Sequence, residues 1–182
     1  MLSIKLSKLL LLNLLSYVAF GQPQEAQDLF EKGLIKNQSY HFIDASVFFT
    51  QAIALEPEFA EAYYQRGLSF EAMGKSSYAI KDFNRAIYQD IKNVEVYLKL
   101  ITYYKNLQQY QSAILICQKL IQAMPENAAG AYYDLGEIYE TMNNVDLAIK
   151  SYQQSLLNAD ESFEDFRKQL LIKIESLKSQ NS

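Results

Sequence analysis

Apolar side chains recur at helical spacing along most of the chain, with polar side chains between them. Rows that begin at Ala26, Ala60, Val94 and Ala129 align with one another, at steps of 34, 34 and 35 residues. Each row holds two amphipathic stretches, and in the last three rows a short polar segment separates them, at residues 74–76, 108–109 and 143–144. The pattern predicts an all-α fold made of four helix–turn–helix units.

At particular positions the four rows have side chains of similar size. The twentieth position is always alanine: Ala45, Ala79, Ala113 and Ala148. The eighth position is glycine in three rows, and the twenty-fourth position of the same rows is aromatic: Gly33 and Phe49, Gly67 and Phe83, Gly136 and Tyr152. Small residues let two helix backbones approach closely, and aromatic residues fill the volume beside them. In the third row Ile101 and Cys117 occupy these two positions, which suggests a compensated exchange of volume.

A unit of this length with a large residue, Leu-Gly, Tyr, Ala, an aromatic residue and Pro resembles the tetratricopeptide repeat. Residues 132–139, Tyr-Tyr-Asp-Leu-Gly-Glu-Ile-Tyr, carry the first part of that pattern nearly whole. The resemblance covers residues 26 to about 162. It implies a right-handed α-solenoid with repeats at 26–59, 60–93, 94–128 and 129–162.

The segment after the last repeat has its own amphipathic pattern. Its apolar residues recur at helical spacing: Phe163, Phe166, Leu170, Leu171, Ile174 and Leu177. We expect residues 163–182 to form a helix that caps the apolar edge of the fourth repeat and, at 179–182, a short frayed tail.

The N-terminal segment differs from the repeats. Lys5 and Lys8 precede an apolar stretch at 9–20, and small residues, Ala19 and Gly21, stand where a signal peptidase would require them. The apolar stretch is shorter than the roughly 20 residues of a membrane-spanning helix. Residues 1–21 are therefore predicted to be a signal peptide and 22–25 a short linker, so that the mature protein is periplasmic or secreted and has no integral membrane span. An uncleaved N-terminal anchor is the alternative.

Composition narrows the choice of function. The formal net charge is −4 and no stripe of Lys and Arg appears, so a nucleic acid is not an expected partner. The only histidine, His41, and the only cysteine, Cys117, have no catalytic partner suggested by the sequence. We expect no enzymatic activity, no cofactor and no metal site.

The family resemblance implies that the second, fifth, ninth and twelfth positions of each repeat line a concave groove. The fifth and ninth positions supply most of its apolar residues: Phe30, Leu34, Tyr64, Leu68, Leu98 and Tyr133. Acids flank them: Glu61, Glu71, Glu95, Glu137 and Glu140. This groove predicts a scaffold that binds a protein or peptide segment with apolar and basic residues. Two alternatives stay open: these side chains only pack neighbouring helices together, or the chain is a structural subunit of a cell-envelope assembly, with self-association through its convex face or ends.

Overall fold

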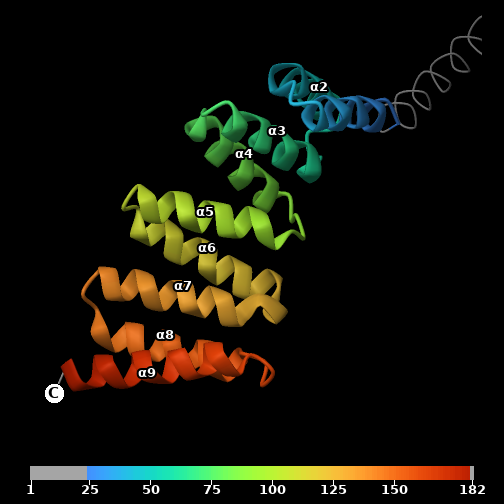
Figure 1. The fold of residues 1–182 in the computed structure, drawn as a ribbon. Coiled ribbons are helices and arrows are strands. Elements are labelled where there is room, and N and C mark those ends of the chain that lie inside the picture. The colour runs from blue at the N-terminus through green and yellow to red at the C-terminus, as the bar shows by residue number, and fades with distance from the viewer. Residues whose placement is uncertain (1–23, 181–182) are drawn as a thin grey trace, which may run out of the picture. The chain divides into compact units, whose positions relative to one another are not determined.

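The computed structural model describes residues 24–180, and the predicted signal peptide at 1–21 lies outside them. The chain forms two compact units, which divide between Ile91 and Lys92. The described residues contain helices and turns and no strand, which confirms the predicted all-α fold class (Figure 1).

Unit 1 contains two helical hairpins. Its helices are 24–38, α2 (Phe42–Leu55), α3 (Ala60–Ala72) and α4 (Ser76–Tyr88). The first of them includes residues 24 and 25 of the predicted linker. Unit 2 contains two hairpins and a final helix. Its elements are α5 (Val94–Asn106), α6 (Tyr110–Ala123), a 3-10 turn (Pro125–Asn127), α7 (Ala128–Thr141), α8 (Val145–Asn158) and α9 (Glu164–Gln180).

All four hairpins turn in the same way. One residue in each turn has a positive φ: Tyr40, Gly74, Gln108 and Asn143. In the second hairpin the N–H of Gly74 donates to the carbonyl of Glu71, and the N–H of Lys75 donates to that of Phe70. The other three turns repeat this pair of bonds at the equivalent positions. The left-handed residue thus satisfies carbonyls at the end of the first helix and reverses the chain.

The two helices of a hairpin contact each other at the glycine and alanine positions of the repeat. A Cβ on Gly33 would lie within 3 Å of the ring of Phe49, and a Cβ on Gly67 would lie equally close to the ring of Phe83. The alanines of the twentieth position are fully buried in all four hairpins. In the first two hairpins the backbone of the first helix therefore rests against an aromatic ring of the second helix, and in the fourth hairpin Gly136 lies in the same way against Tyr152.

Helix α9 covers α8 in unit 2, as the predicted capping helix should. Leu170, Ile174 and Leu177 form a buried cluster with Ala148 and Tyr152 of α8. The guanidinium Nη1 of Arg167 donates to the carbonyls of Leu156 and Ala159, each at 2.8 Å. These bonds satisfy acceptors at the end of α8 and fix the turn into α9.

Candidate functional site

The exposed face of α5 in unit 2 is the part of the predicted groove that is most open. Glu95, Leu98, Thr102 and Lys105 follow one another at spacings of three and four residues, so they share one side of the helix. Leu98 is 40% exposed, and Glu95 and Thr102 are exposed on either side of it. An apolar side chain with polar neighbours is thus presented to solvent.

Lys105 joins this face to α7. Its ammonium donates to Oε2 of Glu137 at 2.7 Å and to Oδ1 of Asp134 at 3.2 Å. Burial alone would lower the pKa of Lys105, but its hydrogen bond to Glu137 and the charges of both carboxylates raise it. Burial raises the pKa of Asp134, although Lys105 opposes this effect. We define the α5–α7 face as Glu95, Leu98, Thr102, Lys105, Tyr133, Glu137 and Glu140.

Glu140 extends the network from α7 to α8 and α9. The Tyr152 hydroxyl donates to Oε2 of Glu140 at 2.9 Å, and the Lys173 ammonium donates to Oε1 at 2.8 Å. Burial, with this hydrogen bond, raises the pKa of Tyr152. Two of the predicted groove acids, Glu137 and Glu140, therefore already have lysine partners within unit 2. A basic partner segment would have to compete with Lys105 and Lys173 for them.

The aromatic members of the predicted groove contribute to packing. Tyr133 is half-buried, and its ring centroid lies 5.7 Å from that of Tyr152 and 5.8 Å from that of Phe166. Burial comes first among the causes that raise the pKa of its hydroxyl. Its position links α7 to both α8 and α9.

In unit 1 the predicted groove aromatics, Phe30 and Tyr64, also pack against other rings. Tyr64 is only 5% exposed, and its ring centroid lies 6.0 Å from that of Phe83. The ring of Phe30 lies 4.8 Å from Phe59 and 5.6 Å from Phe49. Little of Tyr64 is left for a partner to contact.

The remaining predicted residues of unit 1 lie nearer the surface. Leu34, Leu68 and Glu71 are half-buried, and Glu61 is exposed. Helix 24–38 and α3 are joined by polar bonds, since Ser69 donates to the side-chain oxygen of Asn37 at 2.8 Å and Asn37 donates to the carbonyl of Gln65. The two first helices of unit 1 thus share one surface, with leucines partly accessible on it.

The two residues with possible catalytic side chains, Cys117 and His41, lie in different environments. Cys117 is fully buried, and burial raises the pKa of its thiol, so the reactive thiolate is disfavoured. His41 lies at the exposed turn before α2. Within residues 24–180 no group of three acids, histidines or cysteines has the geometry of a metal site.

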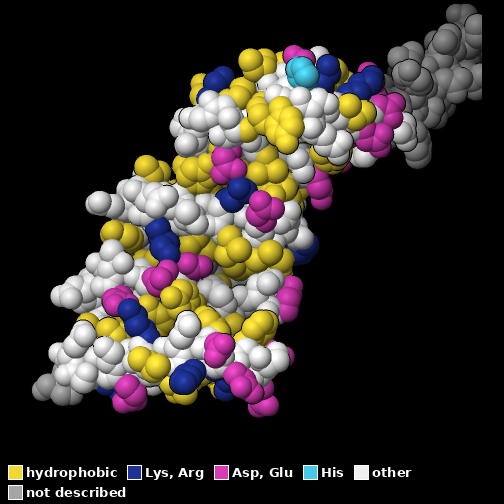
Figure 2. Space-filling view, viewed as in Figure 1, with side chains coloured by type: hydrophobic (Ala, Val, Ile, Leu, Met, Phe, Trp, Pro, Cys, Tyr) yellow, Lys and Arg dark blue, Asp and Glu magenta, His cyan; other side chains and the backbone are white. Residues whose placement is uncertain are grey.

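Charges of both signs are interspersed on the surface. On the face shown in Figure 2, Lys and Arg side chains lie close to Asp and Glu side chains, with apolar side chains between them. None of the helices within the described part of the chain is long and apolar enough to cross a membrane.

Stacked helical hairpins with these glycine, alanine and aromatic positions define a helical-repeat protein. Two sequence models, both of the tetratricopeptide repeat, match this chain, one at residues 61–90 and the other at residues 129–160. The first match coincides with the α3–α4 hairpin and the second with the α7–α8 hairpin. Both support the resemblance that the sequence indicated.

Solved structures share the fold. The chain is similar to YrrB, described as a TPR protein with an unusual peptide-binding site, with a TM-score of 0.61 and 17% identity over 83% of this chain and 76% of that one. It is similar to MamA, with a TM-score of 0.61 and 20% identity over 85% and 90% of the two chains. It is also similar to PilF of Pseudomonas aeruginosa, with a TM-score of 0.59 and 18% identity over 86% and 72%. No curated protein matches the chain in sequence. These likenesses establish the tetratricopeptide-type fold.

Proposed function

We propose that this protein is a non-catalytic scaffold that binds a segment of a partner protein on the first helices of its repeats. The observation that carries the proposal is the exposed Leu98 on the α5–α7 face, with Glu95 beside it and Glu137 and Glu140 nearby. An exposed apolar side chain within a polar rim is typical of a protein interface. The peptide-binding site described for YrrB, which has the same fold, lends support.

The partner segment that best fits the α5–α7 face carries apolar and basic residues. Four acids, Glu95, Asp134, Glu137 and Glu140, stand on or beside this face, against three lysines that pair with them, Lys99, Lys105 and Lys173. One negative charge is left over. This surplus lies with Asp134 and Glu137, which share Lys105, whereas Glu95 beside Leu98 pairs with Lys99. A partner lysine or arginine would compete with Lys105 or Lys173 for the carboxylates of α7.

A pair of matched leucine substitutions tests this proposal. Leu98 of α5 and Leu115 of α6 are both exposed, at 40% and 51%, but they belong to a first and a second helix. The purified chain and its Leu98→Ser and Leu115→Ser variants would be used to capture partners from extracts of the source organism. We expect a partner that the wild type and Leu115→Ser retain and Leu98→Ser loses. Loss with Leu115→Ser instead would move the interface to the second helices.

The alternative function is that of a structural subunit in an assembly of the cell envelope, and α9 gives it a specific basis. Leu171 and Ile172 are adjacent on α9 and are 52% and 62% exposed, and α9 follows the fourth hairpin. Apolar residues at the end of a repeat array permit stacking between copies. Sedimentation of the chain and of Leu171→Ser/Ile172→Ser tests it. An oligomer of the wild type that is absent in the double variant would favour this alternative.

Export is part of the same proposal. It rests on the two lysines, the apolar stretch and the small residues of positions 1–21. Mass spectrometry of the protein isolated from its source tests it, since cleavage would leave Gln22 as the first residue. An intact N-terminal segment found in the membrane fraction would favour the uncleaved anchor.

A further inference from the structure

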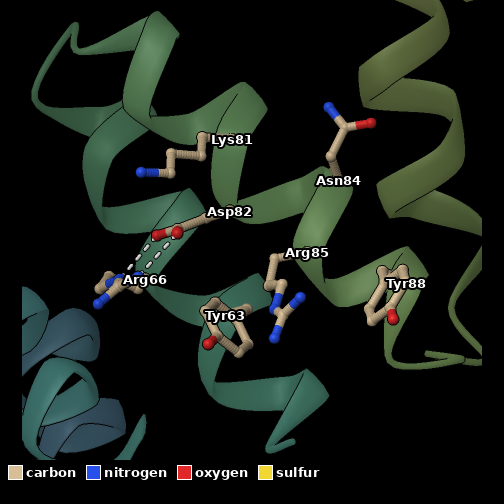
Figure 3. A pocket seen from close by; sticks show the side chains of 7 residues that line it. All are labelled: Tyr63, Arg66, Lys81, Asp82, Asn84, Arg85 and Tyr88. Atoms are coloured by element: carbon tan, nitrogen blue, oxygen red, sulfur yellow. Dashed lines mark hydrogen bonds and ion pairs between the residues drawn. The ribbon is translucent and has the colours of Figure 1, made fainter. Parts of the chain in front are cut away.

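Unit 1 has a hollow between α3 and α4 that lies outside the predicted groove positions. Its volume is about 620 Å³. Tyr63 and Arg66 line it from α3, and Lys81, Asp82, Arg85 and Tyr88 line it from α4 (Figure 3). Cationic and aromatic side chains thus gather at one place on a chain whose net charge is −4.

One cation of the hollow is already neutralised. Arg66 forms a two-point bond with Asp82, from Nε to Oδ2 at 2.7 Å and from Nη2 to Oδ1 at 2.8 Å. Asp82 is only 3% exposed, so this pair belongs to the floor of the hollow. The Nη1 of Arg66 also donates to Thr50 of α2 at 3.0 Å. Arg66 therefore has few donors left for a ligand.

Lys81 and Arg85 supply two further positive charges, which the Arg66–Asp82 pair does not neutralise. Both are exposed, and within residues 24–180 neither has a carboxylate close enough for an ion pair. The guanidinium of Arg85 lies 5.8 Å from the ring centroid of Tyr63 and 4.9 Å from that of Tyr88. These cation–π contacts hold the guanidinium beside the two rings. A guanidinium can bind a carboxylate at two points through its N–H groups.

We propose that this hollow binds an acidic segment of a partner protein, with one carboxylate on Arg85, a second on Lys81 and an apolar side chain against Tyr88. In Figure 3 the Lys81 and Arg85 side chains point in different directions from α4. A single small anion needs donors that converge, whereas two carboxylates along an extended segment suit donors that diverge. The ring of Tyr88, whose residue is 72% exposed, offers the apolar contact beside Arg85. This surface is separate from the α5–α7 face and prefers a partner of the opposite charge.

Selection from a random peptide-display library against the full chain tests the proposal. Selected sequences would be synthesised with blocked ends, so that only side-chain carboxylates can act, and their affinities measured by fluorescence anisotropy. The test variant is Lys81→Ala/Arg85→Ala. The matched control is Lys119→Ala/Lys150→Ala, which removes the same charge from exposed lysines of α6 and α8. Circular dichroism would show that both variants keep their helices.

We expect peptides rich in Asp and Glu next to aromatic or aliphatic residues. Their affinity should fall at least tenfold in Lys81→Ala/Arg85→Ala and less than twofold in the control. Replacing their acids by Asn and Gln should abolish binding to the wild type. Selection of no peptide, of neutral or basic peptides, or of acidic peptides that bind both variants alike would overturn the proposal. So would a dimer of the wild type that Lys81→Ala/Arg85→Ala dissociates, because the occupant would then be a second copy of the chain.

Discussion

A Cβ on Gly67 would lie 2.6 Å from Cε1 of Phe83, so the backbone of α3 rests directly on that ring. Gly67→Leu should therefore force the two helices of this hairpin apart. We expect the free energy of unfolding to fall by about 1–3 kcal/mol or more, as overpacking of a filled core does. Urea denaturation followed by circular dichroism measures the loss.

Gly130 of α7 provides the control for this substitution. A Cβ on Gly130 would meet nothing within 4 Å, and the residue lies within a helix. Gly130→Ala should be neutral or stabilise the fold by up to about 1 kcal/mol, because alanine favours the helix. If Gly67→Leu matched wild type in the same measurement, the contact between Gly67 and Phe83 would not constrain the hairpin.

In the third hairpin the large and small residues of this contact are exchanged between the two helices, which allows a second test. Ile101 and Cys117 hold the positions that glycine and an aromatic residue hold in the other hairpins, and both are buried. Cys117→Phe alone should cost about 1–3 kcal/mol through overpacking, and Ile101→Gly alone about 3 kcal/mol or more through a cavity and a weakened helix. Their combination should be less destabilising than the sum by about 1 kcal/mol or more. Additive losses in a double-mutant cycle would contradict the exchange of volume.

The spacing of small and aromatic residues predicted the fold class, and the helical spacing of apolar residues after the last repeat predicted the capping helix, because both features depend on local periodicity. Gly33, Gly67 and Gly136 stand 34 or 69 residues apart in sequence, and each lies against the aromatic residue sixteen positions later. That pairing follows from hairpin geometry alone. The positive φ at Tyr40 and Gln108 was harder to predict, because only Gly74 and Asn143 are of residue types that favour this conformation.

The candidate site was harder to predict because periodicity gives the side of a helix but not the depth of a side chain. Tyr64 and Leu98 share the fifth position of their repeats, yet Tyr64 is 5% exposed and Leu98 40%. The tyrosine ring is long enough to reach Phe83, whereas Leu98 stays at the surface. The bonds of Lys105 to Glu137 and of Lys173 to Glu140 join residues 32 and 33 positions apart, and only the folded chain brings them together.

Replacing Gln108 by glycine in the turn of the third hairpin should stabilise the fold. Gln108 has a φ of 57°, a conformation that costs a residue with a Cβ about 1–2 kcal/mol. Gln108→Gly relieves this cost but adds freedom to the unfolded chain, so we expect a net gain of about 0.5–1 kcal/mol. Thermal denaturation measures it, and Gly74→Ala should shift the melting temperature in the opposite direction. A melting temperature lowered by Gln108→Gly would contradict the expectation.

The bond between Arg66 and Asp82 should matter far more than an ion pair at the surface. Asp82→Ala would leave the Arg66 guanidinium, whose side chain is 16% exposed, without its counter-charge. We expect a loss of about 3–5 kcal/mol, as for other buried pairs that lose one partner. Asp44→Ala breaks the exposed Lys36–Asp44 pair, with its 3.6 Å separation, and should cost less than about 1 kcal/mol. Equal losses in urea denaturation would show that burial does not set the strength of the inner pair.

Cys117 should make the fold sensitive to alkaline pH. Because burial raises the pKa of its thiol above the ordinary 9.0, the folded chain keeps this proton while the unfolded chain loses it as pH rises past 9. Unfolding then releases a proton, so the free energy of unfolding should fall by about 1.4 kcal/mol between pH 8 and pH 10 from this group alone. Cys117→Ala lacks the thiol and should lose less stability over the same interval by about that amount, while tyrosines and lysines affect both proteins alike. Urea denaturation under reducing conditions at the two pH values gives the difference, and parallel losses in wild type and variant would show that the thiol ionises as easily in the fold as outside it.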